Sequence, residues 1–127
     1  MRAVGVTEYG GPEALRRAMD LFIDKPELGF VWMARQGTHV LGCCVVCYAI
    51  STSRGALVAK LDDVNVRPGL EGQGIGSAML LALKEELRRA DVTRIDTATH
   101  VENPGARRFY ERLGFASLRE ERLSCLL

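Results

Sequence analysis

The sequence has no surplus of either charge and no apolar stretch long enough to cross a membrane. Its 127 residues include 17 Lys and Arg against 16 Asp and Glu, a formal net charge of +1. Proteins that bind nucleic acid through phosphates need a clear basic surplus, so DNA and RNA are not expected partners. The apolar run at residues 40–50 is far shorter than the about 20 residues of a spanning helix. Residues 1–11 lack an apolar core of signal-peptide length, so we expect a cytoplasmic protein with no membrane partner.

A cysteine pattern for a metal site or a disulfide is also missing. Three of the four cysteines, Cys43, Cys44 and Cys47, lie in the apolar run, and Cys125 is near the end. No Cys-x-x-Cys pair is combined with His at metal-ligand spacing. If the run is a strand, Cys43 and Cys47 share a face about 13 Å apart, too far for a disulfide. We expect reduced, buried cysteines and no bound metal.

The composition and the periodicity predict one folded α/β domain covering residues 1–127. Hydrophobic residues make up 47% and charged residues 26% of the chain, which is ordinary for a globular domain. The predicted elements are a weak strand at 2–7, a helix at 12–25, strands at 30–34, 40–50 and 57–66, a helix after residue 74, a strand at 93–101, a helix at 103–113, and a hairpin at 115–118 and 121–127. This order predicts a mixed sheet with helices on its faces.

A glycine-rich loop at residues 71–76 joins the 57–66 strand to the following helix. Glycines let a backbone approach an anion, and the free N–H groups of the first helical turn point at it. The loop is not a P-loop, because Gly76 is followed by Ser77 with no lysine in place. It is not a dinucleotide fingerprint either, because the third glycine position counted from Gly72 is Ser77. By itself the loop is as typical of a structural turn as of an anion site.

Two neighbouring segments favour the anion site. Residues 64–68 read Val-Asn-Val-Arg-Pro, and residues 103–115 read Asn-Pro-Gly-Ala-Arg-Arg-Phe-Tyr-Glu-Arg-Leu-Gly-Phe. With the loop they follow the pattern V-x-P, [RQ]-x-x-G-x-G and N-x-x-A-x-x-F-Y-x-x-x-G-F. In this pattern the chain resembles the GNAT superfamily of N-acetyltransferases over residues 57–115, and in outline over residues 30–50. The resemblance implies a mostly antiparallel sheet with a splayed strand pair, helices on both faces, and acetyl-CoA as co-substrate without a metal.

The resemblance also implies where acetyl-CoA would bind. The backbone of a bulged strand, at Val64 and Val66, would hydrogen-bond the pantetheine amides, and the N–H groups of residues 72–77 would hold the pyrophosphate. Backbone dipoles would let a nearly neutral chain bind this polyanion. The implied cofactor-binding residues are Val64, Asn65, Val66, Glu71, Gly72, Gln73, Gly74, Ile75, Gly76, Ser77, Asn103, Ala106 and Tyr110.

Two of these residues have a structural alternative. Tyr110 matches the family tyrosine that protonates the leaving thiolate, but its spacing is also typical of a core aromatic beside Phe109. Asn103 matches a CoA-contacting asparagine, and before Pro104 it is also a good helix N-cap. Both roles of Asn103 are compatible, since capping uses one side-chain oxygen and leaves the amide nitrogen free.

The general base is left open. Asp62 and Lys60 share a face of their strand, which by analogy faces the amine, and Asp63 points the opposite way. A carboxylate is a weak base at neutral pH unless burial raises its pKa. His100 has the better matched ordinary pKa, Glu102 is a third candidate, and a mechanism without a dedicated base also fits.

We therefore predict an acetyl-CoA-dependent N-acetyltransferase acting on a primary amine of a small molecule or peptide, by direct attack in a ternary complex. The alternative is a non-catalytic acyl-CoA-binding regulatory module of the same fold. It is favoured by Glu71, which replaces the usual Arg or Gln and repels phosphate unless it turns to solvent or pairs with Arg67, and by the short region before residue 30. Thr97 and Thr99 stand at strand positions that are usually apolar in the family, so we expect a more polar floor of the acceptor site.

The apolar segment 123–127 would leave a sheet edge that favours a homodimer.

Overall fold

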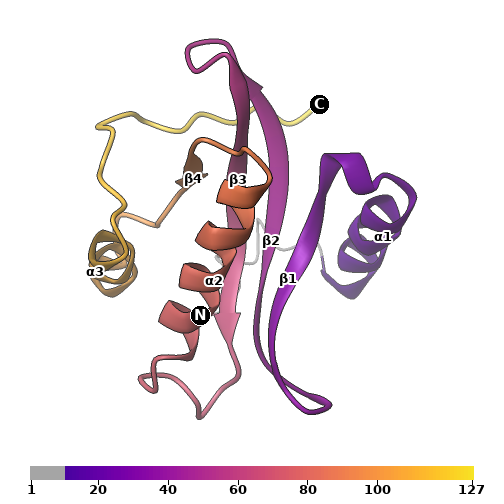
Figure 1. Ribbon diagram of the computed structural model, residues 1–127, viewed down its shortest axis with the longest axis vertical. Coiled ribbons are helices and arrows are strands. Elements are labelled where there is room, and N and C mark those ends of the chain that lie inside the picture. The colour runs from indigo at the N-terminus through magenta and orange to yellow at the C-terminus, as the bar shows by residue number, and fades with distance from the viewer. Residues whose placement is uncertain (1–10) are drawn as a thin grey trace.

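The computed structural model describes residues 11–127 and shows one sheet with helices on both faces (Figure 1). The elements are α1 (Gly11–Asp24), the short 3-10 helix η1 (Pro26–Leu28), β1 (Gly29–Gln36), β2 (His39–Ser51), β3 (Ala56–Val66), α2 (Ile75–Arg89), β4 (Ile95–Thr97) and α3 (Pro104–Arg112). The α/β prediction is confirmed. The weak strand predicted at 2–7 lies outside the described residues.

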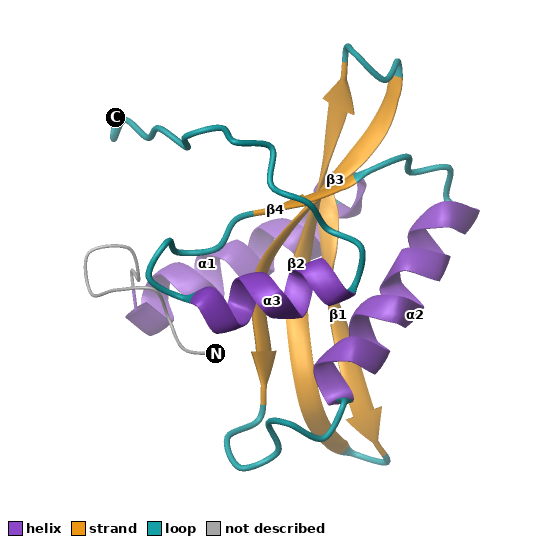
Figure 2. Cartoon of the chain, turned by 90° about the vertical axis from the view of Figure 1, so that its left-hand side faces the viewer, coloured by secondary structure: helices purple, strands orange, loops and turns teal. Residues whose placement is uncertain are grey.

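The sheet is mostly antiparallel, as predicted. Its strand order is β1-β2-β3-β4; the first three strands are antiparallel, and β4 runs parallel to β3. The view in Figure 2 places α1 and α2 on opposite sides of this sheet, with α3 beside the β4 edge.

The core lies between α2 and the face of the sheet beneath it. The helix buries the predicted stripe of Met79, Leu83 and Leu87 and adds Leu80, whereas Ile75 is only half-buried. Trp32 on β1 ties the helix to the sheet through its indole N–H, which donates to the Met79 carbonyl at 3.0 Å. The buried sheet residues beneath α2 are Cys44, Val46, Ala59, Leu61 and Val64.

β3 loses its β4 partner halfway along its length. The last pair between the two strands is Leu61 with Thr97. Just beyond it, one residue of β2, Cys44, faces the two residues 63–64 of β3, and this β-bulge puts Asp63 at a φ of +53°. Residues 62–66 therefore pair with β2 on one side and have no strand from residues 11–127 on the other. The predicted splayed strand pair is confirmed.

One predicted strand is shorter than expected, and the predicted C-terminal hairpin is absent. The strand expected at 93–101 is confined to β4, because β3 bends away beyond Leu61 and offers it no further partner. The hairpin expected at 115–127 is wrong, since no strand forms there. A hairpin needs a surface on which to bury its apolar side, but Leu118 and Leu123 remain 66% and 85% exposed. The sheet edge invoked for a homodimer at 123–127 is thus not formed.

The cysteines are free. Cys44 is buried, Cys43 and Cys47 are half-buried, and Cys125 is exposed, against the expectation that all are buried. No helix between residues 11 and 127 is long and apolar enough to cross a membrane. The same residues contain no cluster of three His, Cys, Asp or Glu side chains that could hold a metal ion.

Candidate active site

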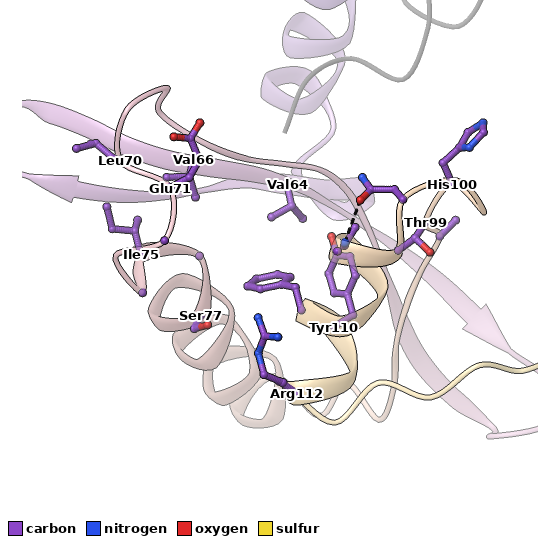
Figure 3. Close-up of a pocket in the computed structure, with 18 of the residues that line it drawn as sticks. Val64, Val66, Leu70, Glu71, Ile75, Ser77, Thr99, His100, Tyr110 and Arg112 are labelled. Carbon is purple, nitrogen blue, oxygen red and sulfur yellow. Dashed lines mark hydrogen bonds between the residues drawn. The ribbon is translucent and has the colours of Figure 1, made fainter.

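A cleft of about 980 Å³ opens where β3 and β4 separate (Figure 3). It brings together four segments that are far apart in the sequence: the free half of β3, the glycine loop with the first turn of α2, the segment after β4, and α3. The lining residues are Val64, Val66, Leu70, Glu71, Gly72, Gly74, Ile75, Gly76, Ser77, Ala98, Thr99, His100, Glu102, Asn103, Gly105, Ala106, Phe109, Tyr110 and Arg112.

The start of α2 presents backbone donors to the cleft that no group of residues 11–127 satisfies. Its N-cap is Gly74, which has a φ of +81°, no side-chain cap and no acidic residue in the following turn. A Cβ added at Gly72 or Gly74 would meet no atom within 4 Å, so the loop has open space on its surface. Free N–H groups at a helix start, beside an open glycine backbone, make a site for an anion such as a phosphate.

The start of α3 is closed by its own side chain. The Oδ1 atom of Asn103 accepts a hydrogen bond from the Ala106 N–H at 3.0 Å, which confirms the predicted N-cap (dashed in Figure 3). Within the described residues the side-chain nitrogen of Asn103 donates no hydrogen bond. It is therefore available to a ligand in the cleft that Asn103 lines.

Close contact between α2 and α3 sets the width of the cleft. A Cβ at Gly76 would lie 3.2 Å from the Phe109 ring, so glycine allows the two helices to approach at this point. Farther along, Lys84 of α2 donates through Nζ to the Leu113 carbonyl at 2.8 Å. These two contacts hold α3 against α2 as the second wall of the cleft.

Tyr110 is both a core residue and a cleft residue. It is 4% exposed, and its ring packs edge-on against Phe109 and Phe115, with centroid distances of 5.2 and 5.3 Å. Burial raises the pKa of the Tyr110 phenol above its ordinary value, while the Thr97 side chain lowers it in part. Tyr110 is therefore a packed core aromatic and a lining residue of the cleft at the same time. Its phenol stays protonated at neutral pH.

Comparison with known proteins identifies the family. A model of the acetyltransferase (GNAT) family matches residues 6–115. The chain belongs to the GNAT family. Its GNAT relatives include an uncharacterized N-acetyltransferase of Methanocaldococcus jannaschii, 35% identical over 91 residues, which are 72% of this chain and 40% of that protein. The chain spans about 40% of the length of the curated relatives it matches.

Solved structures share the GNAT fold with this chain. An integron cassette protein from the mobile metagenome of the Cole Harbour salt marsh is 30% identical, with a TM-score of 0.78 over 91% of this chain and 70% of that one. The glucosamine-6-phosphate N-acetyltransferase of Arabidopsis thaliana is 16% identical, with a TM-score of 0.71 over 95% and 82% of the two chains. At that identity the second likeness concerns the fold alone.

The bases considered for a GNAT reaction occupy different places. Asp62 does not line the cleft. It shares a face of β3 with Lys60, as predicted, and the two form an ion pair at 3.3 Å. This is the face that points away from the core beneath α2, and whether it meets the amine stays a prediction. His100 and Glu102 do line the cleft, and the Glu102 N–H donates to His100 Nδ1 at 3.3 Å. Figure 3 shows the imidazole turned outward, away from Tyr110.

Two of the residues expected to bind the cofactor lie outside the cleft lining. After the bulge, the Asn65 side chain folds back and donates to the Asp63 carbonyl at 3.0 Å. The Gln73 side chain is exposed in the loop between the two glycines. Every other residue named for cofactor binding lines the cleft.

Sequence reasoning missed part of the α3 wall. Gly105, Phe109 and Arg112 line the cleft at intervals of four and three residues, which is the spacing of one helix face. That periodicity was the signal that could have found them. Leu70 and Ala98 were also missed, and because they belong to loops no periodic pattern marks them.

Glu71 keeps its negative charge at the rim of the cleft. Its Oε2 accepts the Gly69 N–H at 2.9 Å, and backbone hydrogen bonds lower the pKa of this carboxyl. The pairing with Arg67 considered from the sequence does not form, because the Arg67 Nε donates to the Val40 carbonyl instead. Arg112 lines the cleft from α3 and supplies a positive charge there.

Proposed function

We propose that this chain transfers the acetyl group of acetyl-CoA to a primary amine of a small molecule or peptide, by direct attack within a ternary complex. The observation that carries the proposal is the cleft between β3 and β4, with free helix N–H groups at the α2 start and the Tyr110 phenol in its wall. Membership of the GNAT family, whose members generally use acetyl-CoA, supports it.

The residues of the cleft fit a CoA thioester. The free N–H groups of the α2 first turn suit its pyrophosphate, and no carboxylate lies in that turn to oppose it. The unpaired edge of β3 at Val64 and Val66 leaves backbone donors and acceptors for the pantetheine amides. The Asn103 amide nitrogen and the Arg112 guanidinium add polar contacts from α3.

Tyr110 is the proposed general acid. The amine nitrogen forms a bond to the acyl carbon, the carbon–sulfur bond breaks, and the departing thiolate takes a proton from the phenol. Because burial raises the pKa of Tyr110, that proton is present at neutral pH. The phenolate is then reprotonated from solvent.

For the ammonium proton we propose transfer to water rather than to a dedicated side chain. The Nδ1 atom of His100 accepts the Glu102 N–H, and Asp62 is paired with Lys60 on the other face of β3. We assign Glu102, which lines the cleft, the role of attracting a cationic amine. The variants His100→Gln and Asp62→Asn are then expected to lower turnover far less than removal of the Tyr110 hydroxyl.

The first experiment is a thermal shift with acetyl-CoA, CoA, ATP and NAD side by side. Binding to the native state at a hundredfold excess over Kd stabilises it by about 2.7 kcal/mol. Turnover with a panel of amines follows, with Tyr110→Phe as the test and Tyr48→Phe, a half-buried tyrosine outside the cleft, as the matched control. No shift with either CoA species contradicts the proposal. A shift without turnover on any amine assigns the chain to the alternative, a non-catalytic acyl-CoA-binding module.

A further inference from the structure

α3 ends in a turn that includes Tyr110. The Tyr110 carbonyl accepts the Phe115 N–H at 3.0 Å, and the Glu111 carbonyl accepts the Gly114 N–H at 3.1 Å. Gly114 has a φ of +95°, which favours glycine at this position. The two bonds form a Schellman motif, and its usual apolar contact is the edge-on packing of the Tyr110 and Phe115 rings. The place of Tyr110 therefore depends on the turn at residues 113–115.

Lys84 of α2 holds this turn. Its Nζ donates to the Leu113 carbonyl at 2.8 Å, a group to which no backbone N–H of residues 11–127 donates. Lys84 is half-buried and forms no ion pair within those residues. An ammonium partly removed from water needs a counter-charge, and the partial negative charge at a helix C-terminus provides one. A Cβ at Gly114 would lie 3.5 Å from Nζ, so the ammonium rests against the turn itself.

The same helix carries the start that suits a pyrophosphate. α2 meets α3 at Gly76, close to that start, where the Phe109 ring packs, and again at Lys84, about two turns farther along. Of the nine residues of α3 only Tyr110 is buried, so its own packing anchors this short helix weakly. A contact at Gly76 alone would let α3 pivot, whereas the second contact fixes its direction.

We propose that Lys84 is a positioning residue, whose ammonium fixes the end of α3 and so holds the Tyr110 phenol at a set distance from the start of α2. The consequence for turnover rests on the proposed function, because it requires Tyr110 to act on a thioester whose phosphates lie at α2. The placement of the phenol does not rest on it.

The first test compares Lys84→Met with Lys84→Arg. Methionine removes the ammonium and keeps an unbranched side chain that is favourable in a helix, and arginine keeps a positive charge and N–H donors. In Lys84→Met the acid is displaced relative to the bound thioester, so kcat is expected to fall about ten- to a hundredfold at an unchanged Kd of acetyl-CoA. Lys84→Arg is expected to keep most of the turnover.

The second test follows the phenol itself, by NMR titration of the full chain labelled at its tyrosine rings, with Tyr110→Phe assigning the signal. Burial raises the pKa of Tyr110. When α3 loses its anchor, water reaches the phenol, so this pKa is expected to fall toward its ordinary value in Lys84→Met and to stay raised in Lys84→Arg. The loss of a nearby positive charge would by itself raise the pKa, so a fall reports on the position of the phenol.

Arg88→Met is the matched control. It removes a positive charge one turn farther along α2, where the guanidinium meets Glu85 on the surface at 3.4 Å. It is expected to leave kcat and the pKa of Tyr110 unchanged. If Lys84→Met does not fold, Lys84→Gln removes the ammonium and keeps a polar side chain.

The outcomes separate this inference from the proposed function. An unchanged or higher pKa of Tyr110 in folded Lys84→Met or Lys84→Gln overturns the role of Lys84, and so does an equal fall in Arg88→Met or Lys84→Arg. A pKa that falls without any loss of kcat supports the placement by Lys84 and overturns Tyr110 as the acid. Failure of the wild-type protein to bind acetyl-CoA overturns the proposed function, and the titration still decides whether Lys84 holds the phenol.

Discussion

The two helices that wall the cleft begin in opposite ways. α2 starts at Gly74 with no side-chain cap, whereas α3 starts at Asn103, whose side chain accepts the Ala106 N–H. An α-helix leaves its first N–H groups without internal partners. In α3 a residue of the chain satisfies one of them, and in α2 they remain available to an anion.

This difference shows that the two helices contribute different kinds of groups to the cleft. α2 contributes backbone donors, since its cleft residues include two glycines and their neighbours, and α3 contributes side chains such as Tyr110 and Arg112. Changes at the α2 start are therefore expected to alter binding, and removal of the Tyr110 hydroxyl on α3 to alter turnover. The predictions below test this division, beginning with the largest expected effect.

Removal of the Tyr110 hydroxyl is expected to act on turnover alone. Tyr110→Phe keeps the ring that packs on Phe109 and Phe115 but removes the proposed acid, so kcat should fall about a hundredfold or more. The Kd of acetyl-CoA, measured by calorimetry, should change little. A kcat within about threefold of the wild-type value would show that α3 supplies no acid.

A carboxylate at the start of α2 is expected to weaken acetyl-CoA binding while it stabilises the helix. Ser77 lies in the first turn and lines the cleft. Ser77→Asp should weaken acetyl-CoA binding about tenfold or more by repelling the pyrophosphate. The same charge stabilises a helix start by about 0.3–1 kcal/mol, so the melting temperature should not fall.

Ser77→Asn is the control for size without charge. It is expected to bind acetyl-CoA more tightly than Ser77→Asp does. Equal affinities of the two variants, measured by calorimetry, would mean that no phosphate meets the start of α2.

The buried phenol also predicts how stability depends on pH. The pKa of Tyr110 is raised in the folded state. Below about pH 10, the ordinary tyrosine pKa, this group therefore does not lower the free energy of unfolding. Above that pH the folded chain binds more protons than the unfolded chain, so the free energy of unfolding falls by up to about 1.4 kcal/mol per pH unit. Denaturant titrations from pH 8 upward should show a smaller fall in Tyr110→Phe than in the wild-type protein; parallel curves would contradict it.

The cap of α3 should contribute about 1 kcal/mol to the free energy of unfolding. Asn103→Ala loses the bond to the Ala106 N–H, and Asn103→Asp keeps an oxygen acceptor for it. Chemical denaturation should therefore find only the alanine variant destabilised. If the amide nitrogen also contacts CoA, Asn103→Asp binds acetyl-CoA more weakly despite its intact cap. Equal stability of both variants would show that the cap does not matter.

The smallest effect is expected at Glu71, whose carboxylate is exposed and bonded to the Gly69 N–H. Glu71→Gln removes a negative charge from the rim and should tighten acetyl-CoA binding only about twofold, as is usual for screened surface charges. The gain should vanish at high salt. Weaker binding of Glu71→Gln would show that the carboxylate orders the loop rather than repels the ligand.

Local patterns in the sequence were enough to predict most elements of the fold. Met79, Leu83 and Leu87 recur at helical spacing and are buried. Asn103 before Pro104 predicts an N-cap that forms. These features depend on neighbours within one or two turns, so the sequence determines them directly. The glycine loop and the motif around Tyr110 likewise predict a GNAT cleft, because each is a contiguous segment.

Only the tertiary structure decided how those segments meet. The family resemblance implied a bulged strand near Val64, but only the structure shows that the bulge lies at residues 63–64 and turns Asn65 away from the cleft. The short β4 and the missing hairpin follow from the absence of a strand partner, which is a long-range condition that propensity cannot see. The Thr97 hydroxyl donates to the Leu61 carbonyl only because β4 pairs with β3, which joins residues 36 apart in sequence. Contiguous segments of this chain determine which groups each wall of the cleft carries. Pairing between strands that are distant in sequence determines where the two walls separate.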